Sequence, residues 1–122
     1  MNNYKTWIIA GGIFGFLGVA IGAFGAHSLK GMLAPEMMEA FKTGVMYQLI
    51  HSVVILAIGL TAKEKFYLPA LFFNIGILLF SFSLYFYSLT YTLAFAMITP
   101  LGGVSFLIGW ALVVVKGIMN KE

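Results

Sequence analysis

Residues 6–26 read TWIIAGGIFGFLGVAIGAFGA, an apolar stretch that contains no charged side chain. A helix rises about 1.5 Å per residue, so about 20 apolar residues cross the hydrocarbon core of a bilayer. The stretch therefore predicts a transmembrane helix and indicates that lipid surrounds the fold. Residues 23–25 loosely resemble a signal-peptide cleavage site, but the apolar run is longer than the core of a typical signal peptide. We expect the segment to be retained.

Glycines recur along this segment at spacings of 4, 3, 4 and 3 residues: Gly11, Gly15, Gly18, Gly22 and Gly25. A period of 3.5 residues places them on one stripe of a helix. Lipid tails are as apolar as leucine, so helices associate in membranes through close packing, which glycine permits. The stripe therefore predicts a packing face. The partner of this face is either another span of this chain or a second copy of the chain. Packing within the chain is the simpler interpretation, because the chain has further apolar segments that could serve as the partner.

The rest of the chain has the same apolar character. Of its 122 residues, 61% are hydrophobic and 9% are charged, and the mean hydropathy is +1.01. A soluble domain is about 45–50% apolar and about 25% charged. Three more segments, residues 44–62, 66–89 and 92–115, are long enough to span a bilayer. We expect one all-α domain over residues 1–122, an integral membrane bundle of four transmembrane helices.

The longest connection, residues 27–43, contains a helical pattern of its own. Pro35 suits a first helical turn. After it, apolar Met37, Met38 and Phe41 alternate with charged Glu36, Glu39 and Lys42. This amphipathic pattern predicts a short interfacial helix between the first and second spans, continuing into the second. A solvated extension of the second span is the alternative interpretation.

The lysines indicate an orientation. In an alternating topology one side carries Lys5, Lys63, Lys65, Lys116 and Lys121, and the other carries Lys30 and Lys42. The positive-inside rule then places both termini in the cytoplasm of a bacterial plasma membrane. Trp7 and Trp110 lie near predicted span ends or within about two turns of them, and we expect them to be interfacial anchors, because aromatic rings concentrate at membrane–water interfaces. Because the lysines lie between apolar runs, the net charge of +3 predicts membrane lipids, and no nucleic acid, as partners.

A few polar residues fall within or beside the spans. Ionisable groups are costly in lipid and normally face the bundle interior. His51 and Thr99 each lie about 10 Å below the outer end of their span. Tyr47 and Gln48 are one turn from His51, and His27 lies at the outer mouth of the first span. We expect these five residues to form a candidate polar cluster in the outer half of the bundle.

Three interpretations of His51 are open. The first is a neutral, hydrogen-bonded histidine that fixes helix register, with Gln48 and Tyr47 as partners. The second is an outward-facing pocket for a small molecule or lipid, in a transporter-like protein. The third is haem held by His27 and His51 as axial ligands, which the absence of a C-x-x-C-H motif disfavours. We expect no cofactor and no metal site.

Catalysis has little support in the sequence. The chain has no cysteine, which excludes thiolate metal ligands and cysteine nucleophiles. The spans carry no Asp, Glu, Lys or Arg, although carriers and proton pathways usually need one. No nucleophile–base pattern or phosphate-binding loop is visible either. We expect no enzyme and no catalytic residue. The leading hypothesis is a structural or accessory protein that influences membrane integrity or a partner complex, with a homo-oligomer or a membrane protein partner left open.

Three stretches of the chain resemble the signature blocks of the family called domain of unknown function 423. They are GAFGAHSLK (22–30), FKTGVMYQLIHS (41–52) and TPLGGVSFLIGW (99–110), in that order. The resemblance implies a four-helix integral membrane protein with no established reaction, and it brings no catalytic residue. The residues that match the blocks are His27, Lys30, Thr43, Gly44, Tyr47, Gln48, His51, Thr99, Pro100, Gly102, Gly103 and Trp110.

Overall fold

The computed structural model describes residues 3–119, which are almost entirely helical. The elements are α1 (Asn3–Ser28), α2 (Pro35–Thr61), η1 (Glu64–Phe66), α3 (Tyr67–Gly76), η2 (Ile77–Ser81), α4 (Phe82–Thr90) and α5 (Leu93–Ile118). The four elements from η1 to α4 form one continuous helical segment, Glu64–Thr90, here called the third span. Within the described residues, four helical segments are long and apolar enough to cross a membrane. This confirms the predicted all-α fold with four spans.

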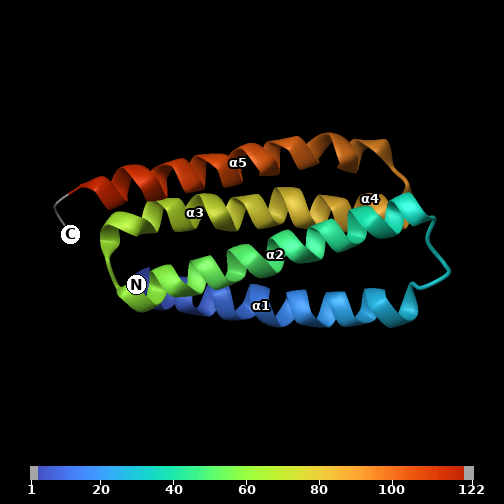
Figure 1. Cartoon of the computed structure of the whole chain (residues 1–122), viewed down its shortest axis with the longest axis horizontal. Helices are drawn as coiled ribbons and strands as arrows, with labels where there is room; N and C mark the ends of the chain where they lie inside the picture. Colours follow the sequence, from blue (N-terminus) through green and yellow to red (C-terminus); the bar gives the residue numbers. More distant parts are fainter. Residues whose placement is uncertain (1–2, 120–122) are drawn as a thin grey trace.

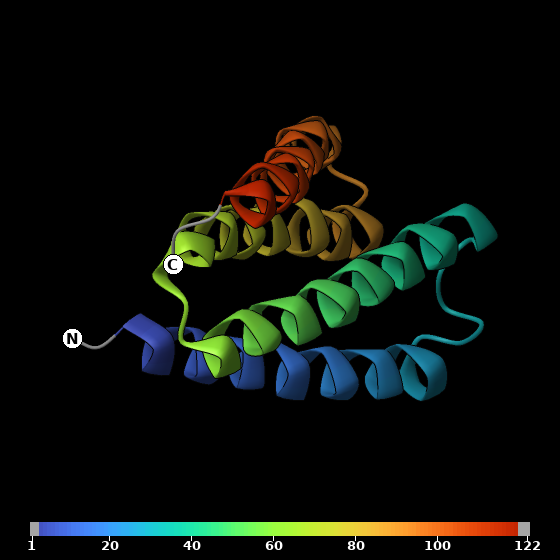
Figure 2. The ribbon, with the colours of Figure 1, turned by 60° about the vertical axis from the view of Figure 1, so that its left-hand side comes forward.

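The spans pack as two hairpins. α1 packs on α2, α5 packs on the third span, and α2 joins the hairpins by packing on the third span. Figure 2 shows the resulting order, from α1 through α2 and the third span to α5. The start of α1 and the end of α5 lie at the same end of the molecule (Figure 1). The two central helices therefore carry most of the interior.

Side-chain burial follows this order. The main core combines α2, the third span and α5 around Phe73, which is fully buried. The outer faces of α1 and α5 expose large apolar residues, such as Phe16 at 74% and Leu107 at 70%. Contiguous apolar surface of this kind is rare on soluble proteins and suits contact with lipid tails.

The expected interfacial helix is not a separate element. Residues 35–43 form the first turns of α2, which continues unbroken from Pro35 to Thr61. Their apolar stripe faces the bundle, because Phe41 is buried and contacts both Gly25 and Tyr85. An amphipathic helix binds a membrane surface through its apolar face, and here neighbouring helices already cover that face. The prediction is thus corrected: the amphipathic pattern marks the start of the second span helix.

The third span contains one irregular turn. Residues Ile77–Ser81 adopt a π-helical turn between α3 and α4. Opposite this turn, a Cβ atom at Gly102 of α5 would overlap the backbone of Leu79 and Phe80. A π turn is rare and widens the helix locally. Gly102 thus provides the space that lets α5 approach the widened turn.

Candidate functional site

The five glycines of the predicted stripe on α1 all face α2. A Cβ at Gly11 would lie 2.7 Å from the backbone nitrogen of Leu56, and one at Gly25 would overlap the ring of Phe41. Between these positions, Gly15 faces Ser52, Gly18 faces Leu49 and Gly22 faces Val45. At Gly11 and Gly25 there is no space for a side chain, whereas a Cβ at Gly15 would make an ordinary contact, 3.6 Å from Ser52 Oγ. The stripe is therefore occupied by a span of the same chain rather than by a second copy.

His51 joins α2 to α5 with both ring nitrogens. Nδ1 lies 2.7 Å from the backbone oxygen of Tyr47, and Trp110 Nε1 donates to His51 Nε2 at 3.0 Å. Because an indole N–H can only donate, Nε2 accepts and Nδ1 carries the proton. The ring also stacks on Phe106, with centroids 3.8 Å apart and an interplanar angle of 11°. The result is a neutral imidazole that is 4% exposed and held in one tautomer.

Gln48 forms a second, separate junction. Its side chain is fully buried. The amide Nε2 donates to the backbone oxygen of Phe14 in α1 at 2.8 Å, and Oε1 accepts from Tyr85 Oη in α4 at 2.7 Å. Gly18 of α1 lies beside this amide, since a Cβ there would be in ordinary contact with Gln48 Nε2, at 3.5 Å. One side chain thus connects three helices.

The predicted partnership of His51 with Gln48 is wrong. Residues three positions apart on a helix differ by about 60° in direction. Here this difference turns Gln48 toward α1 and α4, whereas His51 points toward α5. Tyr47 contacts His51 through its backbone oxygen and through ring stacking, at a centroid distance of 6.0 Å. The three residues share a region of α2 but do not form one network.

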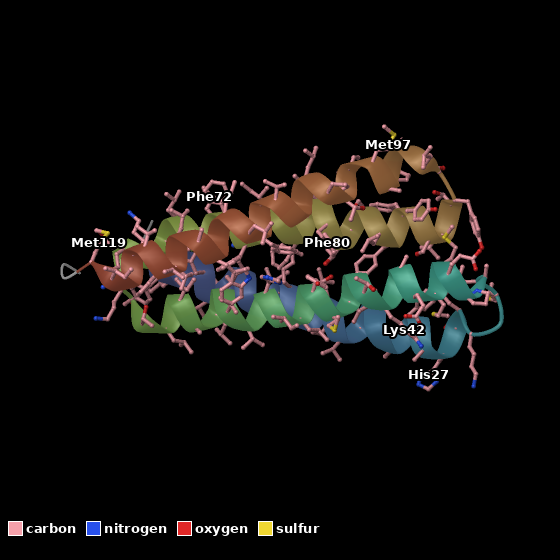
Figure 3. The ribbon with its side chains drawn as sticks, turned by 45° about the horizontal axis from the view of Figure 1, so that its top comes forward. His27, Lys42, Phe72, Phe80, Met97 and Met119 are labelled. Carbon is pink, nitrogen blue, oxygen red and sulfur yellow. The ribbon has the colours of Figure 1, made fainter. Side chains whose placement is uncertain are left out.

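The other two predicted members lie elsewhere. Thr99 Oγ1 of α5 lies 2.6 Å from Ser83 Oγ of α4, which makes a third junction. His27 is exposed in the last turn of α1, near the end of the bundle in Figure 3. The neighbouring Gly25 packs on Phe41, and His51 lies ten residues further along α2, about 15 Å away. The two histidines are therefore not brought together as a haem pair.

Trp110 is a partner of His51 that the sequence did not reveal. It is expected from the sequence as an interfacial anchor, and its indole N–H also donates to His51 between α5 and α2, while 39% of the residue stays exposed. Ser105 was also missed: its hydroxyl donates to the backbone oxygen of Phe72 at 2.7 Å and joins α5 to α3. The signal available for Trp110 was its place in the third quoted block, two turns from the end of its helix.

A groove of about 410 Å³ reaches His51 between α2 and α5. Its walls include Tyr47, Gly103 and Phe80, and Phe80 lies near mid-length of the bundle in Figure 3. Exposed residues of α5, among them Val104 and Leu107, border it. The groove therefore opens on the lipid-facing flank, whereas the pocket considered from the sequence opens to the outside. We call it the His51 groove.

Acidic, histidine and cysteine side chains do not gather anywhere in residues 3–119 as a group of three that could hold a metal ion. Hydroxyl groups in the interior bond mainly to backbone oxygens. Ser52 and Ser88, for example, donate to Leu49 and Tyr85 in their own helices. The chemistry of the interior is therefore neutral hydrogen bonding.

Known proteins similar to this chain are membrane proteins. The inner membrane protein YgdD (UPF0382) of Escherichia coli K12 is 41% identical, with 97% of this chain and 93% of the relative covered. The membrane protein YwdK (UPF0382) of Bacillus subtilis 168 is 36% identical, with 93% and 97% covered. A UPF0382 membrane protein of Staphylococcus epidermidis RP62A is 40% identical, with 91% and 93% covered. No solved structure matches the chain.

The family described as "Protein of unknown function (DUF423)" matches residues 21–103. That range contains Gln48, His51 and the π turn, whereas the hydrogen-bond partners Phe14 and Trp110 lie outside it. Together with full-length relatives at about two-fifths identity, the match leads to one conclusion: the chain belongs to the DUF423 family of multi-pass membrane proteins.

Proposed function

We propose that this protein is a non-enzymatic structural or accessory component of the bacterial plasma membrane. The observation that supports this most directly is the junction at Gln48. Both ends of its buried amide are bonded to other helices, to Phe14 in α1 and to Tyr85 in α4. A buried polar group that is fully satisfied in this way rigidifies a core and is not available to a substrate. The same argument applies to His51.

We also propose that both termini face the cytoplasm. The end of the molecule where α1 starts and α5 finishes carries Lys5, Lys63, Lys65 and Lys116, whereas the opposite end carries Lys30 and Lys42. Cytoplasmic ends of membrane proteins are enriched in lysine and arginine because these residues resist translocation. The lysine bias supports this orientation.

The structural role is tested in a bacterium that lacks its own copy of the gene. We expect the plasma membrane of this strain to admit more of a dye that intact cells exclude. His51→Leu and Gln48→Leu should restore the barrier in proportion to the amount of folded protein in the membrane. Unchanged dye uptake after deletion contradicts a role in membrane integrity. A variant folded to the parent level that does not restore the barrier contradicts a purely structural interior.

The His51 groove favours a second candidate function, the binding of a small membrane-dissolved molecule or lipid in a transporter-like protein. A substitution at Gly103 distinguishes the two candidate functions. A Cβ at this position has room, because its nearest contact would be Phe80 at 3.9 Å. Gly103→Leu should fill the groove without pressing on a backbone. If the interior is structural, this variant restores the barrier as the parent does. If the Gly103→Leu protein folds but does not restore the barrier to the dye, the result supports the second candidate function instead.

A further inference from the structure

A second groove lies between the C-terminal part of α1 and the N-terminal part of α2. It has a volume of about 410 Å³, within the range of ligand pockets, and it is lined by small residues of α1 and apolar residues of α2. From Lys42 to Ile50 it descends about 12 Å along α2. One leaflet of a bilayer core is about 15 Å thick. The groove thus has the reach of an acyl chain in a single leaflet.

The mouth of this groove is cationic. A cavity of the same volume adjoins it, shares Gly25, Ala26, Met38 and Lys42 with it, and adds Lys30. Lys30 and Lys42 are exposed, and neither has an ion-pair partner within residues 3–119. The nearby Glu36 and Glu39 do not line either cavity. In Figure 3, Lys42 lies toward the end of the bundle at which α1 leads into α2.

We propose that this groove binds one anionic phospholipid, with an acyl chain along α1 and α2 and the phosphate between Lys30 and Lys42. In the proposed orientation the lipid belongs to the outer leaflet. An acyl chain gains little by leaving surrounding lipid for an apolar groove, so the headgroup decides which lipid is held. A lysine near the membrane surface favours an anionic lipid by about fivefold.

The bound lipid would also give a reason for the two lysines. Positive charge is disfavoured on the translocated side of a membrane protein. Lys30 and Lys42 are nevertheless the lysines at that end of the described chain, and they converge on one cavity from the loop after α1 and from α2. A shared phosphate would neutralise both. The site is independent of the His51 groove, which α2 and α5 form.

The test uses the full-length protein in detergent and native mass spectrometry. Phosphatidylglycerol and phosphatidylethanolamine with identical chains serve as probes. We expect phosphatidylglycerol to bind more tightly, and Lys30→Gln with Lys42→Gln to weaken that binding by roughly 25-fold while leaving phosphatidylethanolamine unchanged. The matched control, Lys5→Gln with Lys116→Gln, removes the same charge at the other end and should behave like the parent.

The groove itself is tested with Ala26→Leu, which places a larger side chain where both cavities meet. We expect this variant to be as stable as the parent toward unfolding. We also expect it to lose the binding of phosphatidylglycerol. Equal binding of the two lipids, or equal loss of binding in the control pair, overturns the proposal. The proposal is also overturned if the parent protein is a dimer and Ala26→Leu converts it to a monomer, because a second copy of the chain would then occupy the groove.

Discussion

Gln48 and Ser81 are both fully buried in the bundle, but they satisfy their polar groups differently. Gln48 exchanges hydrogen bonds with two neighbouring helices. The hydroxyl of Ser81 has no hydrogen-bond partner within residues 3–119. A buried group without a partner costs about 1–3 kcal/mol, whereas a satisfied group stabilises modestly. The two positions therefore predict opposite responses to the removal of a polar group.

We expect Gln48→Leu to lower the free energy of unfolding by about 1–3 kcal/mol, because it leaves the buried hydroxyl of Tyr85 unpaired. Ser81→Ala removes a hydroxyl that has no hydrogen-bond partner within residues 3–119. We expect it to leave the free energy of unfolding unchanged or to raise it. Unfolding in mixed micelles with increasing denaturing detergent measures both. A loss of stability in Ser81→Ala as large as that in Gln48→Leu would contradict this account.

At the scale of the helices, backbone contact holds the α1–α2 hairpin together. Gly11 of α1 meets the backbone of Leu56, and Gly59 of α2 in turn meets Ile8, where a Cβ would lie 2.8 Å from the backbone nitrogen. A Cβ at the next glycine along the chain, Gly12, would meet no atom of the described residues within 4 Å. Of these two adjacent glycines, Gly11 thus lies on the packing face and Gly12 points away from it.

Gly11→Ala and Gly12→Ala form a matched pair. The first forces the helices apart and should destabilise the protein by about 1–3 kcal/mol, the usual cost of overpacking. The second adds a methyl group that faces lipid, and it should be neutral or stabilise by up to about 1 kcal/mol through helix propensity. Thermal unfolding of the two variants in the same detergent compares them. Equal stability would show that the face tolerates a Cβ.

For the whole molecule, the distribution of lysines predicts which end faces which compartment. The natural chain has no cysteine, so a single substitution gives one labelled site. Ser28, at the end of α1, and Ala62, just after α2, lie at opposite ends of the bundle. In intact cells Ser28→Cys should react with a membrane-impermeant thiol reagent, and Ala62→Cys should react only after the membrane is opened. The reverse pattern would invert the proposed orientation.

The sequence by itself determined the four helical spans and the glycine stripe. A bilayer core offers the backbone no hydrogen-bond partner, so a long apolar segment there must be helical, and its identity can be read from composition and length. The helices extend past the expected spans; α2, for instance, begins at Pro35 rather than near Gly44. Apolarity marks the part in lipid, whereas helical hydrogen bonding continues beyond it.

Only the tertiary structure decided which polar groups meet. The sequence placed Tyr47, Gln48 and His51 within one turn, but their partners Phe14, Tyr85 and Trp110 come from three other helices. The spacing of residues within a helix fixes their relative directions, and it carries no information on which neighbour lies in each direction. That depends on helix order and on close approach at glycines, which together turn one expected cluster into separate junctions.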